Sequence, residues 1–130
     1  MGVTIDHAKR RAEFTAGPGF SGLVLSRAIA GMFDEDPRTA SYDLIFDLRG
    51  SDEGATQAGL ELVAAAYHRH ERTPGLKHSC FVSTDPNYPL WVAAIGQFFS
   101  DRQIRIFVTA ENARAYLDCA LAERDEAPPP

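Results

Sequence analysis

The stretch YDLIFDLRG, residues 42–50, decides the fold that this sequence predicts. Its residues Leu44, Ile45, Phe46 and Leu48 form a nearly continuous apolar run that is too short for a helix. Such runs are typical of strands that are covered on both faces, as in a parallel sheet. The stretch therefore predicts a buried central strand that ends in a loop of small and charged residues.

Helical patterns and short apolar runs alternate on the carboxyl side of this strand. A helix rich in Ala, Leu and Glu is expected within residues 56–72, and TPG at 73–75 ends it. Strands are expected at 77–84 and 103–109, and Thr109 caps a last helix. Between these strands, Asp85 and Pro86 predict the start of a third helix. That helix should point the following residues inward: Leu90, Trp91, Ala94, Ile95 and Phe98.

On the amino side, residues 3–16 alternate between apolar and polar positions around a polar centre, which predicts a β-hairpin. GPG at 17–19 ends it, because proline fixes its own φ and glycine tolerates unusual backbone angles. A helix follows, and DEDP at 34–37 stops it. Its apolar stripe has helical spacing and consists of Leu25, Ala28, Ile29, Met32 and Phe33.

The predicted order is β-β-α-β-α-β-α-β-α. Alternating strands and helices imply crossovers between parallel strands, so we expect an α/β fold: a mixed, mainly parallel sheet flanked by helices, with an antiparallel strand from the hairpin. One domain should cover residues 1–123. The proline-rich residues 124–130 should form a disordered tail.

Composition excludes some partners. The 130 residues include 13 Lys and Arg against 18 Asp and Glu, a net charge of −5, and the basic residues are scattered. Nucleic acid and anionic membranes are poor partners for such a surface. No run approaches the roughly 20 apolar residues of a membrane helix, and no targeting segment is visible. We expect a cytoplasmic protein in which Cys80 and Cys119 are buried, reduced thiols.

The loop after the central strand is the first candidate site. Ligands of open α/β sheets bind where strand carboxyl ends meet helix amino termini. There Asp47 ends the strand, Gly50 allows a tight turn, and Ser51 and Thr56 flank the next helix. Free amides at a helix start favour a phosphate or a phosphorylated side chain. Ser and Thr are also common helix caps, so capping is the alternative interpretation.

The aromatic third helix is the second candidate. Tyr88, Trp91 and Phe98 could line a pocket for an apolar ligand, or belong to an ordinary core. No metal site is expected, because His68 and His70 lie two positions apart on a helix and so point in different directions. We find neither a phosphate-binding glycine loop nor a nucleophile motif, so no enzyme activity is predicted.

The central strand with DLRG at 47–50, the aromatic third helix and the closing IRIFVTAENARAYL at 104–117 resemble SpoIIAA-like proteins of the STAS and SEC14-like superfamily. The resemblance covers residues 3–121. It implies a mixed sheet flanked by helices and a binding or regulatory role without a cofactor. Some relatives are switched by phosphorylation of a serine after the central strand. The nearest positions here are Ser51 and Thr56, but the usual Asp-Ser-Ser-Gly order is absent.

Two functions follow as hypotheses. The first is a non-enzymatic regulatory or protein-interaction module that uses the loop at residues 50–56. The second is a small carrier of a lipid or another apolar molecule beneath the third helix. A homodimer is also expected, although no pattern selects the face through which it would form.

Overall fold

The computed structural model describes residues 2–17, 22–50, 56–71 and 76–126, apart from the side chains of residues 89, 91 and 124–126. Ser51 and the side chain of Trp91, both predicted site residues, therefore lie outside the described part. The elements are β1 (Gly2–Asp6), β2 (Arg11–Thr15), α1 (Gly22–Glu35), the 3-10 helix η1 (Pro37–Ser41), β3 (Asp43–Asp47), α2 (Gln57–His70), β4 (Lys77–Val82), α3 (Tyr88–Gly96), β5 (Arg102–Phe107) and α4 (Ala110–Glu126).

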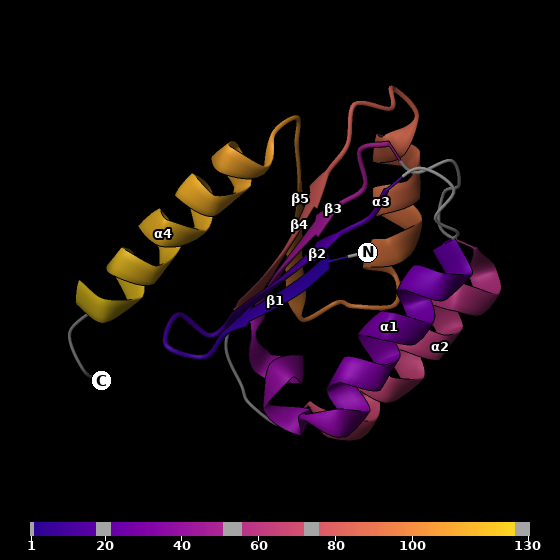
Figure 1. Ribbon diagram of the computed structural model, residues 1–130, viewed down its shortest axis with the longest axis horizontal. Coiled ribbons are helices and arrows are strands. Elements are labelled where there is room, and N and C mark those ends of the chain that lie inside the picture. The colour runs from indigo at the N-terminus through magenta and orange to yellow at the C-terminus, as the bar shows by residue number, and fades with distance from the viewer. Residues whose placement is uncertain (1, 18–21, 51–55, 72–75, 127–130) are drawn as a thin grey trace.

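The strands form one five-stranded sheet in the order β1-β2-β3-β4-β5. β1 is antiparallel to β2, and the other neighbouring strands are parallel. Crossovers of one hand that always step in the same direction place their helices on the same face. Accordingly α1, α2 and α3 cover one face, and α4 covers the other (Figure 1). The predicted class, a mainly parallel α/β sheet flanked by helices, is confirmed.

β3 lies in the middle of the sheet, and every one of its residues is buried. Side chains alternate between the two faces of a strand. Leu44 and Phe46 pack in the core beneath α1 and α2, whereas Ile45 packs in the smaller core beneath α4. The apolar run of the sequence therefore serves two cores at once, which explains why it shows no polar alternation.

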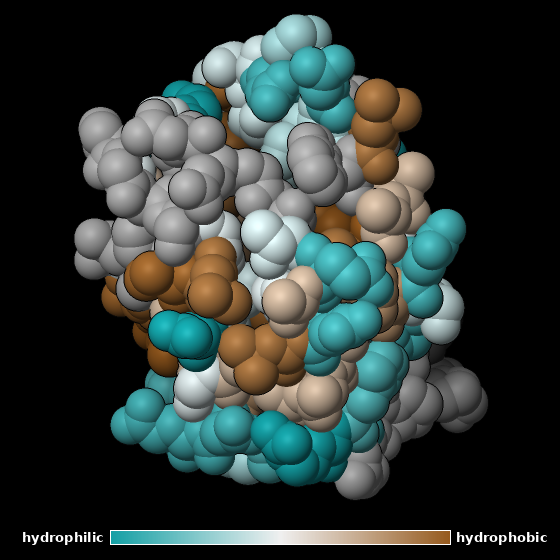
Figure 2. Space-filling view, turned by 90° about the vertical axis from the view of Figure 1, so that its right-hand side faces the viewer, coloured by the Kyte–Doolittle hydropathy of each residue, from teal (hydrophilic) through white to brown (hydrophobic). Residues whose placement is uncertain are grey.

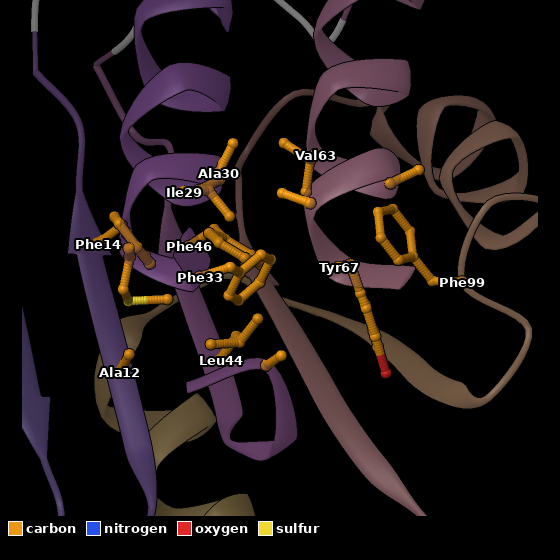
Figure 3. Packing of buried hydrophobic residues seen from close by; sticks show 14 of the residues in the cluster. Ala12, Phe14, Ile29, Ala30, Phe33, Leu44, Phe46, Val63, Tyr67 and Phe99 are labelled. Atoms are coloured by element: carbon orange, nitrogen blue, oxygen red, sulfur yellow. The ribbon is translucent and has the colours of Figure 1, made fainter. Parts of the chain in front are cut away.

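Aromatic rings and aliphatic side chains form the larger core between the sheet and α1 to α3 (Figure 3). The rings of Phe14 and Phe46 stack with centroids 5.5 Å apart, and Phe46 lies 4.9 Å from Phe81 on the next strand. Tyr67 of α2 stacks on Phe99 at 5.4 Å. Such contacts stabilise the sheet beyond the burial of apolar area.

A buried arginine crosses the amino ends of the strands. Arg102 donates hydrogen bonds to Ser79 Oγ at 2.7 Å, to Ala40 O at 3.2 Å and to His78 O at 2.9 Å. It also donates to the carbonyl of Tyr42. Its guanidinium thus satisfies carbonyl groups of η1, of β4 and of the residue before β3 that would otherwise be buried without partners.

Helices α1 and α2 approach most closely where a glycine replaces a side chain. A Cβ placed on Gly59 would lie 2.5 Å from Oγ and 3.2 Å from Cβ of Ser26. Real Cβ atoms essentially never come within 3.0 Å of another heavy atom outside their own neighbourhood. The contact between the two helices therefore depends on the absence of a side chain at position 59.

The third helix starts later than predicted. Asp85 does not cap it: its carboxylate accepts a bond from the amide of Asn87 at 2.9 Å in a turn, and the helix begins at Tyr88. The prediction that Leu90 points inward is wrong, because this residue is 75% exposed. Ile95 is buried as predicted.

The second difference concerns the last helix. Cys80 is buried as predicted, but Cys119 is exposed, so its predicted burial is wrong. The core beneath α4 uses Ala110, Ala113 and Leu117, and position 119 lies off that stripe. The helix also continues through residues 124–126, past the boundary expected at residue 123.

Candidate functional site

The carboxyl ends of the parallel strands lie along one edge of the sheet. Beyond the strands, Leu48 N donates to Val82 O at 2.9 Å, and Ser83 N donates to Phe107 O at 3.0 Å. The loops that leave β3, β4 and β5 consequently start side by side. This edge is where ligands of open α/β sheets usually bind.

Asp47 occupies the end of β3 and is held by its own loop. Its carboxylate accepts hydrogen bonds from Arg49 Nη2 at 2.7 Å, from Arg49 Nε at 2.9 Å and from the Arg49 amide at 3.2 Å. The side-chain bonds from Arg49 keep the pKa of Asp47 below its ordinary value of 3.8. A carboxylate with a lowered pKa is a weak proton acceptor at neutral pH, so this geometry favours a charged surface over acid–base chemistry.

Gly50 and Thr56 bracket the loop. Gly50 has φ of 82°, in the left-handed region that side chains disfavour, so the chain turns here because the residue is glycine. Thr56 is the N-cap of α2, and its Oγ1 accepts the amide of Gly59 at 3.0 Å. The hydroxyl oxygen of Thr56 thus performs the capping role that the sequence left as an alternative. Residues 51–55 lie outside the described part.

A second ion pair lies near Asp47, on the face that α4 covers, and its acid, Glu13, stands in the middle of β2. Arg114 of α4 contacts both carboxylate oxygens of Glu13, with distances of 2.6 Å from Nη2 to Oε1 and 3.2 Å from Nε to Oε2. Arg114 also contributes to the lowered pKa of Asp47. Sequence reasoning missed this pair, because its members lie 101 positions apart and neither belongs to a motif. Together Glu13, Asp47, Arg49 and Arg114 form what we call the charged edge.

An apolar hollow opens between α1, α2, α3 and the sheet, with a volume of about 80 Å³. Its lining includes Leu25, Leu60, Phe81, Ile95 and Tyr88. Tyr88 is only 5% exposed, and burial raises the pKa of its hydroxyl. No hydrogen bond joins this hydroxyl to another residue that the structure describes.

The other aromatic candidates are placed differently. Phe98 does not line the hollow; it is half-buried, and its carbonyl oxygen lies 2.9 Å from His68 Nε2. The backbone of Trp91 belongs to α3, but its side chain lies outside the described part. Of the predicted pocket residues, the structure therefore places Tyr88 on the hollow.

Histidines are dispersed over the molecule. His7 Nδ1 lies 2.7 Å from Tyr42 Oη, His70 Nε2 lies 2.7 Å from Asp34 Oδ1, and His78 Nδ1 lies 3.3 Å from Tyr116 Oη. Within residues 2–17, 22–50, 56–71 and 76–126, no three His, Cys, Asp or Glu side chains come together as they would around a metal ion.

Comparison with protein-family models and with curated proteins finds no match for this chain. The helices in the described ranges are all too short or too polar to cross a membrane.

Proposed function

We propose that this protein is a non-enzymatic regulatory or protein-interaction module of the SpoIIAA-like, STAS-type kind, and that its contact surface is the carboxyl edge of the sheet. The resemblance of residues 3–121 to that family motivates the proposal. The mostly parallel sheet with helices on both faces is compatible with it. The surface would include Gly50, Thr56, the start of α1 and the charged edge.

Exposed apolar side chains next to this loop carry the proposal. Leu23 and Val24, in the first turn of α1, are 36% and 46% exposed. They lie near the start of α2, because α1 and α2 meet at Ser26 and Gly59. Figure 2 views the face formed by α1, α2 and α3, where brown apolar residues interrupt the teal polar surface. An apolar centre with a polar rim is the usual anatomy of a protein interface.

The ion pair of Asp47 and Arg49 supplies polar surface where β3 ends and the loop to α2 begins. Asp47 and Arg49 neutralise each other, and the side chain of Arg49 remains 39% exposed. Arginine is enriched at interfaces because its guanidinium can bond an acceptor while its planar face packs against other groups. Arg49 can therefore keep its bond to Asp47 and also contact a partner.

The test compares two leucine substitutions. Leu23→Asp places a charge at the start of α1. Leu76→Asp places the same charge at a 59% exposed position just before β4, where the strands begin and not where they end. We expect the tagged protein to capture a stoichiometric partner from its native cell, and the purified partner to bind Leu23→Asp at least tenfold more weakly than Leu76→Asp. Equal binding by both variants, or capture of no stoichiometric partner, would contradict the proposal.

A carrier function is a second candidate, favoured by the hollow beside Tyr88. Small-molecule sites usually measure about 300–1,000 Å³, whereas this hollow measures about 80 Å³. A ligand would therefore have only a few heavy atoms, unless the helices move apart. Leu60→Trp would fill the hollow, whereas Leu62→Trp on the exposed side of the same helix would not. Native mass spectrometry should find extra mass on the second variant only; bare protein in both cases counts against a carrier.

A further inference from the structure

Strand β1 leaves one side of the sheet open. It is the first strand in the sheet order, and all of its residues, Gly2–Asp6, are exposed. Natural edge strands usually carry lysine, proline or a bulge that prevents pairing with another chain. The sequence GVTID contains no lysine or proline, and its register against β2 runs without a bulge. The edge therefore lacks these protections.

The hydrogen bonds of β2 show which groups of β1 face outward. Asp43 N donates to Arg10 O, and Ala16 N donates to Asp47 O, so the even-numbered residues of β2 direct their peptide groups toward β3. The odd-numbered residues of β2 direct theirs toward β1, so Thr15, Glu13 and Arg11 form the hydrogen-bonded pairs of the antiparallel ladder with Gly2, Thr4 and Asp6. The N–H and C=O groups of Val3 and Ile5 consequently point to the open edge.

The same two residues carry exposed apolar side chains. Val3 is 43% exposed and Ile5 is 37% exposed. Their partners in β2 are Phe14 and Ala12, which belong to the larger core. The side chains of Val3 and Ile5 therefore lie on the same face of the sheet as α1, beyond the part that this helix covers. Backbone groups and apolar surface are therefore offered by the same two residues of one strand.

We propose that the open edge of β1 pairs with β1 of a second copy of this chain, antiparallel, about a twofold axis at Thr4. Val3 then faces Ile5 of the second copy, and each such pair exchanges both backbone hydrogen bonds. Thr4 faces Thr4, and Gly2 faces Asp6, so no like charges meet. The strand is thus complementary to itself, as a twofold interface requires.

Other registers of this pairing are poorer. A shift by one residue would place apolar side chains on opposite faces of the joined sheet. A twofold axis at Val3 or at Ile5 would pair fewer residues of the strand. Only a twofold axis at Thr4 pairs every residue of Gly2–Asp6 with a residue of the second copy.

The opposite edge of the sheet is less suited to self-pairing. β5 contains Arg105, whose guanidinium lies 5.2 Å from the ring centroid of Tyr116 and donates to its hydroxyl at 2.9 Å. Arg105 lies inside β5, where a charge opposes pairing with another copy, whereas the one charged residue of β1, Asp6, ends its strand and faces Gly2 in the proposed pair. The two edges therefore differ in chemistry, and β1 is the one that a second copy fits.

Charge substitutions at Thr4 test this register, because only a twofold axis at Thr4 places that residue beside its own copy. We expect sedimentation equilibrium to find a dimer of the wild-type protein. Thr4→Lys and Thr4→Glu should each weaken the dimer at least tenfold, and an equimolar mixture of the two should form a heterodimer. Thr84→Lys, at an exposed position after β4, should dimerise like the wild type.

A proline variant provides a second measurement. The amide of Val3 faces the open edge, so Val3→Pro should remove a bond between copies while the ladder between β1 and β2 remains. A monomeric Val3→Pro with the wild-type circular dichroism spectrum would agree with the proposal. A wild-type monomer at every concentration, an unchanged dimer of Thr4→Lys, or the absence of a heterodimer in the mixture would overturn it.

Discussion

Alanine in place of Gly59 should destabilise this protein, although alanine usually stabilises helices. The new methyl group would lie 2.5 Å from Oγ and 3.2 Å from Cβ of Ser26 in α1, so the two helices must separate or Ser26 must move. Overpacking of this kind costs about 1–3 kcal/mol. Alanine returns at most about 1 kcal/mol through its higher helix propensity. We therefore expect a net loss of about 1–2 kcal/mol in the free energy of unfolding.

Gly31→Ala is the matched control. Position 31 also lies in a helix, but a Cβ there meets no atom within 4 Å. The control should gain about 0.5–1 kcal/mol from helix propensity alone. Urea denaturation followed by circular dichroism measures both variants. In a double-mutant cycle, Ser26→Gly should relieve the loss caused by Gly59→Ala, with a coupling of about 1 kcal/mol. If Gly59→Ala is as stable as Gly31→Ala, the reasoning is refuted.

Three further predictions concern buried polar groups and thiols. Arg102→Met keeps the buried stem but removes the donors of several buried carbonyls, so urea denaturation should find a loss of about 3 kcal/mol, and Arg102→Lys should not restore it because lysine lacks the planar fork. The pKa of Asp47 is lower in the folded protein than in the unfolded chain, so the carboxylate stabilises the fold above about pH 4, and this contribution disappears as pH falls through the lowered pKa. The stability difference between wild type and Asp47→Asn should therefore shrink on acidification, and a difference that is independent of pH would contradict this account. A thiol reagent that releases a chromophore should label exposed Cys119 in the native protein but reach Cys80 only after unfolding. Cys80 is buried, and burial raises its pKa to about 12; the absorbance of the chromophore counts the thiols that have reacted.

Local sequence patterns predicted the strands and α-helices of this fold, but not η1, because each of those patterns is decided by nearby residues. The apolar run of β3 needs cover on both faces, and the stripe from Leu25 to Phe33 needs one face of α1 to be buried. The prediction for Leu90 failed because α3 has only nine residues and is apolar at almost every position, and the residues that meet the core are Tyr88, Val92 and Ile95. A short helix offers too few repeats to fix its phase.

Contacts between residues that are far apart in the chain could not be predicted from local sequence patterns. The pair of Glu13 and Arg114 joins β2 to α4, and it could be found only once the fold had brought the two together. The hydrogen bonds of Arg102 likewise depend on η1 lying beside the sheet. At the candidate site, the sequence correctly placed Asp47 at the strand end, but its pairing with Arg49 is a matter of side-chain geometry.

The consecutive order of the strands has a consequence for folding. Each strand after β1 adds to the edge that the preceding strand has just formed, so most pairings join segments that are neighbours along the chain. Such an arrangement keeps contact order low for a parallel sheet and shortens the search for native pairings. We therefore expect the sheet to assemble in the direction of synthesis, with α4 closing the second face after the last strand is in place.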